Sequence, residues 1–306
     1  MGALFLRAIG VRNHRILVGL LLAVSCCHLW AAGPAPKAPS VWSVQWQPNG
    51  LVNGSPVLFQ VKPALHLKTL SGKWLEHDIS FALDPKTKIW NAIAGIALNV
   101  KPGVYTLSLS GATPTGKDVS FQRRVTVRAG KYRSTAITVE GKYTAPSQEQ
   151  LEIIARDKKT KQETFSQVSP DREWAGVFNP PLQAPFSDTF GTTRTFNGQV
   201  RSTHEGLDFA AVTGTPIAAL NAGTVLLARP LYFEGNCVVL DHGQGLLTLY
   251  LHMSEFKVKE GDKVERGQEL GLVGGTGRAS GPHLHIAVRW QGVYVDPATL
   301  LKLKMP

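Results

Sequence analysis

Alternating apolar and polar residues mark the first half of the chain. They occur at residues 57–61, 103–109 and 119–127, and this period of two predicts half-buried β-strands. Turn-forming clusters of Gly, Pro, Asn and Ser separate the runs at 48–50, 53–55 and 101–103. Short strands with regular turns are typical of a sandwich, so residues 41–140 are predicted to form an immunoglobulin-like β-sandwich domain.

A helix is predicted at residues 147–168. Ser147 can cap it, Gln150 lies where a capping box needs it, and an apolar stripe follows at Leu151, Ile154 and Ala155. Charged residues dominate the second half, so the helix is expected to lie on a surface or to bridge two domains. We therefore assign residues 141–185 to a short helical connector, which ends in a Pro-rich boundary.

Residues 186–306 return to short apolar runs separated by glycine-rich turns. The whole chain has 306 residues, of which 30 are Gly and 19 are Pro, and 43% are hydrophobic. This composition favours a mostly β protein of roughly two globular domains and argues against general disorder.

The N-terminus is predicted to be a targeting segment. Residues 1–32 carry three arginines, no acidic residue and an apolar stretch at 16–24, as in a signal peptide. An uncleaved membrane anchor and lipidation at Cys26 are the alternatives, and each sends the body of the protein outside the cytoplasmic membrane. A Pro-rich linker follows at 33–40. Cys237 lies far from this leader and is expected to be a small core residue rather than a reactive thiol.

Positive charge is concentrated in the first part of the chain. Residues 33–179 carry 19 Lys and Arg against 11 Asp and Glu, whereas residues 180–306 carry 11 of each. A basic exported segment suits attraction to an anionic envelope polymer or membrane surface, or serves solubility. Nucleic acid is not expected as a partner, because the basic residues are scattered and export is predicted. The oligomeric state is left open.

Histidines supply the candidate chemistry, since five of the nine fall between 204 and 285. His204 precedes Asp208 by four residues, and His283 and His285 share one face of a predicted strand with Cα atoms roughly 7 Å apart. These imidazoles and the carboxylate can surround one cation. Nitrogen and oxygen donors suit tetrahedral Zn²⁺, and three protein ligands with an open position mark a catalytic site.

Each element also has a simpler interpretation. The spacing of His204 and Asp208 alone is weak, and a strand with two histidines is often only a polar face. His252 could be a hydrogen-bonded core residue, and we favour a structural role for His242, which lies in a predicted hairpin turn. The combination in one glycine-rich β region is what indicates a metal site.

The C-terminal region resembles a known family. The segments that carry the resemblance are Phe190-Gly191, 194–198, 204–211, 249–253, 258–268 and 274–285. In order and spacing they are similar to the lysostaphin-like (LytM-type) zinc endopeptidases over residues ~186–300, and residues upstream resemble the N-terminal accessory region of envelope members. The resemblance implies an antiparallel β-barrel-like metallopeptidase domain at 186–306.

The resemblance also implies residue roles and a function. It makes His204, Asp208 and His285 the ligands of one Zn²⁺ per chain, and His252 and His283 the catalytic histidines. It implies an exported metalloendopeptidase, in the periplasm or cell envelope, that hydrolyses peptide cross-links of bacterial peptidoglycan. The alternative is a non-catalytic wall-binding scaffold or an activator of a cell wall amidase.

Overall fold

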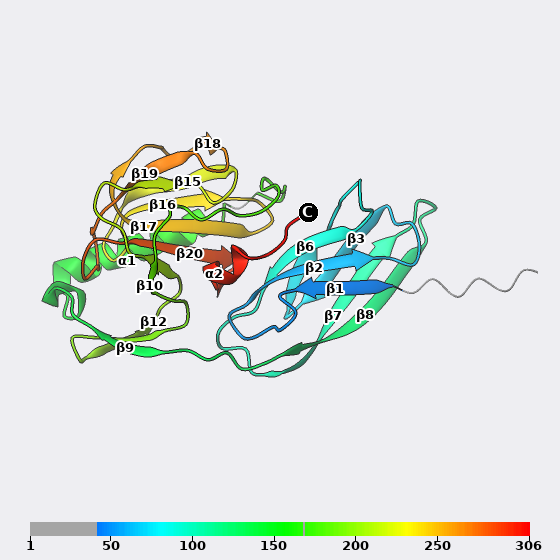
Figure 1. The fold of residues 1–306 in the computed structure, drawn as a ribbon, viewed down its shortest axis with the longest axis horizontal. Coiled ribbons are helices and arrows are strands. Elements are labelled where there is room, and N and C mark those ends of the chain that lie inside the picture. The colour runs from blue at the N-terminus through cyan, green and yellow to red at the C-terminus, as the bar shows by residue number, and fades with distance from the viewer. Residues whose placement is uncertain (1–41, 168) are drawn as a thin grey trace, which may run out of the picture. The chain divides into compact units, whose positions relative to one another are not determined.

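The computed structural model describes residues 42–167 and 169–306, so the predictions for the leader and for the linker lie outside the described residues. Two sheets and a connector precede the C-terminal sheet (Figure 1). In the N-terminal half the strands are β1 (Ser43–Gln47), β2 (Pro56–Lys62), β3 (Thr69–Trp74), β4 (His77–Ser80), β5 (Ala82–Leu83), β6 (Trp90–Gly95), β7 (Gly103–Ala112), β8 (Asp118–Val127) and β9 (Ser134–Ile137).

The connector and the C-terminal part contain the remaining elements. The helical segments are η1 (Gly141–Tyr143) and α1 (Gln148–Phe165) in the connector and α2 (Pro297–Leu300) in the C-terminal part. The strands of the C-terminal part are β10 (Phe186–Asp188), β11 (Thr193–Phe196), β12 (Val200–Thr203), β13 (Leu207–Phe209), β14 (Pro216–Ala218), β15 (Gly223–Leu231), β16 (Gly235–Asp241), β17 (Leu246–Phe256), β18 (Lys263–Val264), β19 (Glu269–Val273), β20 (Leu284–Trp290) and β21 (Val293–Val295).

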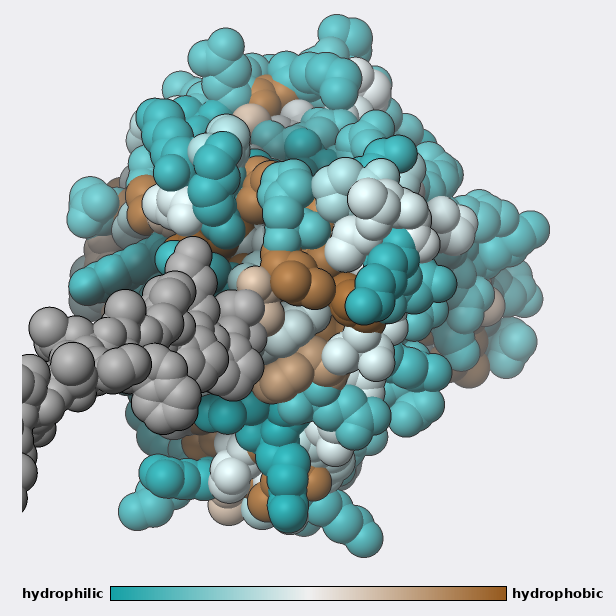
Figure 2. All heavy atoms as spheres, turned by 90° about the vertical axis from the view of Figure 1, so that its right-hand side faces the viewer, coloured by the Kyte–Doolittle hydropathy of each residue, from teal (hydrophilic) through white to brown (hydrophobic). Residues whose placement is uncertain are grey.

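The first eight strands form two four-stranded antiparallel sheets, in the orders β1-β2-β6-β5 and β4-β3-β7-β8. The alternating runs at 57–61, 103–109 and 119–127 all lie in strands of these sheets, which confirms the predicted strands. Large apolar side chains such as Phe59 and Trp74 are completely buried, and the Trp74 indole donates a hydrogen bond to the Gly95 carbonyl. The surface in Figure 2 is mainly hydrophilic with a small apolar area near its middle.

The predicted helix is present as α1. Ser147 and Gln150 make the expected capping box, in which each side chain bonds the other's backbone N–H. The apolar stripe is not what holds the helix, since Leu151 is 46% exposed. Instead, the buried Asp157 accepts a hydrogen bond from the Tyr232 backbone N–H at 2.6 Å, so a polar contact attaches α1 to the residue that follows β15.

Strand β9 links the connector to the C-terminal part. It lies within the range expected for the sandwich domain, yet it pairs in parallel with β11, from Ser134 opposite Thr193 to Ile137 opposite Phe196. Strand β12 pairs with the other edge of β11. A segment N-terminal to the helix therefore builds part of the sheet that borders the histidine-rich region.

The C-terminal region is built on one large, predominantly antiparallel sheet. Its main path runs β10-β13-β20-β17-β16-β15-β18, with β19 joining β14 to β17 and β21 pairing with β20. Within the described residues this sheet does not close on itself, so the barrel-like expectation is not confirmed. Apolar side chains of β13, β16, β17 and β20 are buried almost completely and form the rigid base of the histidine-rich site.

Cys237 is buried in a small apolar cluster on β16, as expected of a core residue. Burial raises the pKa of its thiol far above the ordinary range, which makes it unreactive. Across residues 42–167 and 169–306 no helix combines the length and apolar character needed to cross a membrane.

Candidate metal centre

Two neighbouring strands position the predicted ligands. Strands β13 and β20 pair antiparallel, and their register places Asp208 directly opposite His285. Leu207 and Phe209 flank Asp208 and are buried in the core, so the alternation of β13 turns the carboxylate to the other face of the sheet. His204 lies just before β13, where its backbone N–H donates to the Thr192 carbonyl.

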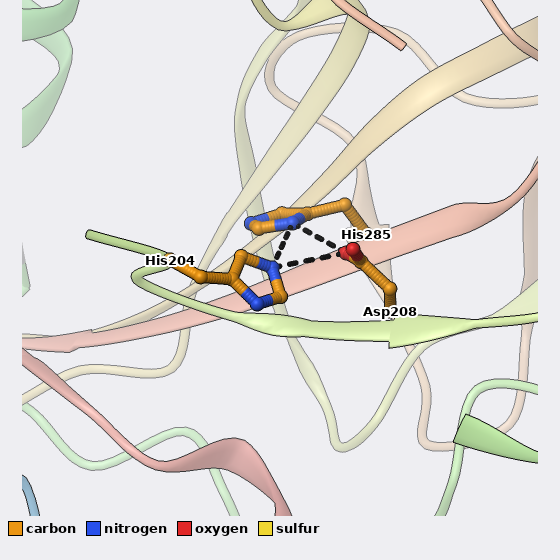
Figure 3. A group of neighbouring side chains, drawn as sticks. All are labelled: His204, Asp208 and His285. Atoms are coloured by element: carbon orange, nitrogen blue, oxygen red, sulfur yellow. Dashed lines mark hydrogen bonds and ion pairs between the residues drawn. The ribbon is translucent and has the colours of Figure 1, made fainter. Parts of the chain in front are cut away.

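The donor atoms of these three residues converge on one point (Figure 3). His204 Nε2 lies 3.1 Å from Asp208 Oδ1 and 3.0 Å from His285 Nδ1. His285 Nδ1 is 2.8 Å from the same carboxylate oxygen. A triangle of this size lets all three atoms contact one ion at the bond lengths of about 2.0–2.2 Å that zinc adopts, so the donor set fits the metal.

Protonation of the imidazoles also suits metal binding. The Nδ1–H of His204 donates to the Thr189 carbonyl at 2.9 Å, which leaves the Nε2 lone pair facing the other donors. Burial lowers the pKa of His285 to about 4, so its ring is neutral at neutral pH. His285 can therefore offer a lone pair without first losing a proton.

Arg194 and Asp188 form a hydrogen-bond network with the carboxylate of Asp208. Burial alone would raise the pKa of Asp208, but the close contacts with the imidazoles of His204 and His285 outweigh it and hold that pKa far below the ordinary range. Its second oxygen, Oδ2, accepts a hydrogen bond from the Arg194 guanidinium. Arg194 also bonds Asp188 through Nε at 2.9 Å, so one side chain fixes two carboxylates.

Gly206 leaves room for the ring of His285. A Cβ atom at this position would lie 2.3 Å from His285 Nε2 and 2.4 Å from the Ile286 carbonyl oxygen. Both distances are far below van der Waals contact. The glycine between His204 and Asp208 is thus required by the close approach of β20.

The two other predicted site histidines lie beside the cluster. His283 Nε2 is 3.8 Å from Asp208 Oδ1, and its Nδ1 bonds the Gly281 carbonyl at 2.9 Å. The rings of His252 and His283 are 4.7 Å apart between centroids, and His252 Nδ1 bonds the Thr276 carbonyl at 2.8 Å. In both residues this carbonyl contact fixes Nδ1 as the protonated nitrogen and leaves a lone pair on Nε2.

His252 has an unusual backbone conformation. Its φ is +63°, in the left-handed region that a non-glycine residue rarely adopts within a strand. Burial lowers its pKa to about 3, and the neighbouring rings of His283 and His285 act in the same direction, so the side chain is neutral at neutral pH. Strained residues of this kind concentrate at functional sites.

His242 lies elsewhere, as its structural interpretation requires. It is fully buried, with Nδ1 at 2.6 Å from the Ala222 carbonyl and Nε2 at 2.8 Å from the Thr248 hydroxyl. Burial lowers its pKa to about 4. His242 is therefore a hydrogen-bonded core residue.

A cleft of about 410 Å³ opens onto the cluster. One wall is strand β9 with Arg133, and another is the loop 278–283, which ends at His283. Asp188, Arg194 and Asp208 also line the cleft. A bound molecule in this cleft would lie against both Asp208 and His283.

Sequence reasoning missed the supporting groups. The sequence places Arg194 in a segment that carries the resemblance but predicts no role for it, and it gives no sign of Asp188 or of the carbonyls of Thr189 and Thr276. Their contacts join residues between four and 24 positions apart through the fold. Backbone carbonyls carry no sequence signature, although an arginine near a predicted carboxylate ligand is a signal that could have been followed.

Comparisons with known proteins identify the family of the C-terminal region. Residues 202–297 match the model of peptidase family M23. Over 103 residues the chain is 44% identical to the peptidoglycan DD-endopeptidase ShyA of Vibrio cholerae, and over 97 residues it is 41% identical to the DD-carboxypeptidase/endopeptidase Mpg of Neisseria meningitidis. The first match covers 34% of this chain and 23% of ShyA, and the second covers 32% and 22%.

One solved structure resembles most of the chain. It is a protein of Pseudomonas aeruginosa described as an M23 peptidase, with a TM-score of 0.62 and 30% identity. The similarity covers 82% of this chain and 94% of that structure, so it includes regions outside the segment matched by the family model. By sequence and by fold, the chain belongs to peptidase family M23.

Proposed function

We propose that this protein is a zinc metalloendopeptidase that hydrolyses peptide cross-links of bacterial peptidoglycan. The convergence of His204, Asp208 and His285 on one point is the observation that carries the proposal. Membership of family M23 and similarity to a DD-endopeptidase of V. cholerae support the reaction and the substrate. The matched segment spans about a quarter of that relative, so the substrate rests on this proposal.

His204, Asp208 and His285 would hold one zinc ion. When bound, zinc lowers the pKa of water and polarises a carbonyl group. His283 lies on the cleft side, with Nε2 as the nitrogen that can accept a proton from the attacking water and return it to the leaving amine. His252 is close enough to His283 to share this proton handling or to stabilise the developing negative charge.

The alternative, a wall-binding protein without turnover, predicts damage to this machinery. The chain instead keeps three converging donors and two further histidines whose Nδ1 atoms are fixed by carbonyl groups. Nothing favours the loss of catalysis, and we therefore prefer the enzyme.

Two histidine variants test the proposal. His285→Ala removes a metal donor, so zinc content and release of muropeptides from purified peptidoglycan should fall together. His283→Ala leaves all three donors, so zinc should stay while turnover falls by about 10²–10⁴-fold, the usual contribution of one general acid or base. Zinc is measured by elemental analysis and release by chromatography, on the same folded preparations.

Chelation is the matched control, because it should abolish release by the wild type and zinc should restore it. A wild type that binds zinc and peptidoglycan but releases nothing would favour the scaffold. Loss of zinc from His283→Ala with full activity in His285→Ala would show that the roles are reversed.

The remaining parts of the chain complete the proposal. Residues 1–32 would direct export to the periplasm or cell envelope, by a cleaved signal or as an anchor. The two N-terminal sheets would form an immunoglobulin-like accessory domain before the connector. An exported location fits a cell wall substrate, and detection of the protein in cell fractions tests it.

A further inference from the structure

Arg278 lies in the loop between β19 and β20, on the wall of the cleft that contains His283. Its guanidinium carbon stacks over the ring of Phe196 at 4.5 Å and over the ring of Phe233 at 4.6 Å. The side chain also borders a smaller pocket that contains His204, His252 and His285. Arg278 therefore lies beside the candidate metal site, between the cleft and the smaller pocket.

The loop that carries Arg278 is fixed by its backbone. The Arg278 N–H donates to the Phe233 carbonyl at 2.8 Å, and the Thr276 carbonyl contacts His252 Nδ1. Gly277 has a φ of +73°, and a Cβ there would lie 2.3 Å from the Gly235 nitrogen, so the loop passes close to β16. These contacts place Arg278 before any ligand binds, which reduces the entropy lost on binding.

Among the described residues, the Arg278 guanidinium has no hydrogen-bond or ion-pair partner. The other two arginines of the cleft, Arg133 and Arg194, both pair with Asp188. Glu234, the carboxylate that acts on Arg278 through space, is paired with Lys161. Partial burial lowers the pKa of Arg278, so the fold disfavours its charge without compensating it.

We propose that Arg278 binds a carboxylate of the peptide substrate and that it forms an anion subsite of the cleft. This inference rests on the proposed function, since it names the chemistry of the peptide that the site accepts. The guanidinium carbon lies over two phenyl rings, which offer no hydrogen-bond acceptor, so the N–H donors of Arg278 stay available to a ligand. A planar carboxylate can approach that edge and make two parallel hydrogen bonds.

The test compares peptides that differ in one charge. Cross-linked stem-peptide dimers with free carboxylates are matched with the same dimers after conversion of the carboxylates to carboxamides. The zinc-loaded wild type should have a kcat/KM about 10- to 100-fold higher for the free acids, the range expected of a charge-assisted hydrogen bond. Arg278→Gln should lose this preference, through a lower kcat/KM for the free acids, while it keeps its zinc content.

Two further variants serve as controls. Arg289→Gln also removes an arginine that stacks on aromatic rings, those of Phe165 and Tyr294, but Arg289 does not line the cleft and the preference should remain. Arg278→Lys keeps the charge without the planar fork and should show an intermediate preference. It also provides the comparison if Arg278→Gln does not fold.

The outcomes separate this inference from the proposed function. Equal hydrolysis of acids and amides by the wild type overturns the carboxylate subsite and leaves the enzyme intact. If no dimer is hydrolysed, the proposed function fails, and calorimetry with His283→Ala decides the subsite alone. Tighter binding of acids than of amides, abolished by adding Arg278→Gln, supports the subsite, and equal binding overturns it.

Discussion

The buried His242 should make the stability of the protein depend on pH. Its ring is enclosed by the fold, bonded to the Ala222 carbonyl and the Thr248 hydroxyl, and packed edge-on to Phe178 at 5.5 Å. Burial lowers its pKa from the ordinary 6.5 to about 4, although Glu173 acts in the opposite direction. Because the unfolded chain binds the proton more readily, acid shifts the equilibrium toward unfolding.

The magnitude follows from the two pKa values, 6.5 unfolded and about 4 folded. The contribution is complete above pH 6.5 and is lost as the pH falls toward 4. Linkage gives a loss of about 2 kcal/mol at pH 5 and about 3 kcal/mol at pH 4, relative to neutral pH.

His242→Gln provides the comparison, because its amide does not titrate. Urea unfolding followed by tryptophan fluorescence, at pH 7.5, 6, 5 and 4, measures the free energy of unfolding of both proteins. The candidate metal ligands are common to both, so their titration cancels in the difference. The wild type should lose about 2 kcal/mol more than the variant between pH 7.5 and 5. Parallel profiles would refute the argument.

Two further predictions concern the metal site. Gly206→Ala should abolish zinc binding, because the added Cβ would lie 2.3 Å from the His285 ring. The control is Gly50→Ala, which should bind zinc normally because a Cβ there meets no atom within 4 Å. Unchanged zinc content in Gly206→Ala would contradict the packing. Arg194→Met should weaken zinc binding by about 10- to 100-fold in competition with a chelator, because Asp208 loses the group that orients it. An unaltered affinity would show that Arg194 only closes the cleft.

Patterns of neighbouring residues correctly predicted the strands and the helix start that depend on interactions between residues close in sequence. The alternating runs became β2, β7 and β8, and the capping residues Ser147 and Gln150 correctly placed the start of α1. The burial of α1 was not predictable in the same way. Its attachment through Asp157 depends on the backbone of Tyr232, which is 75 residues away in the sequence.

In the candidate site, too, the local spacing of residues was predictable and the contacts between distant segments were not. Spacing within the predicted strand put His283 and His285 together, although His283 lies one residue before β20, and the resemblance placed them with His204 and Asp208, which lie close by in the structure. The parallel pairing of β9 with β11 has no local signal, because hydrogen bonds between backbones do not depend on side-chain pattern. The roles of the five residues stay predictions until metal and activity are measured.

The pairing of β9 with β11 also decides which fragment of the protein can fold by itself. The segment shared with the family begins at residue 202, but the strand that borders its cleft begins at Ser134. A fragment that starts at residue 180 would expose the edge of β11 and remove Arg133 from Asp188. The segment that the family shares and the segment that folds together thus have different limits. Expression of the shorter segment would leave an unpaired β-strand edge, prone to aggregation, beside the candidate metal centre.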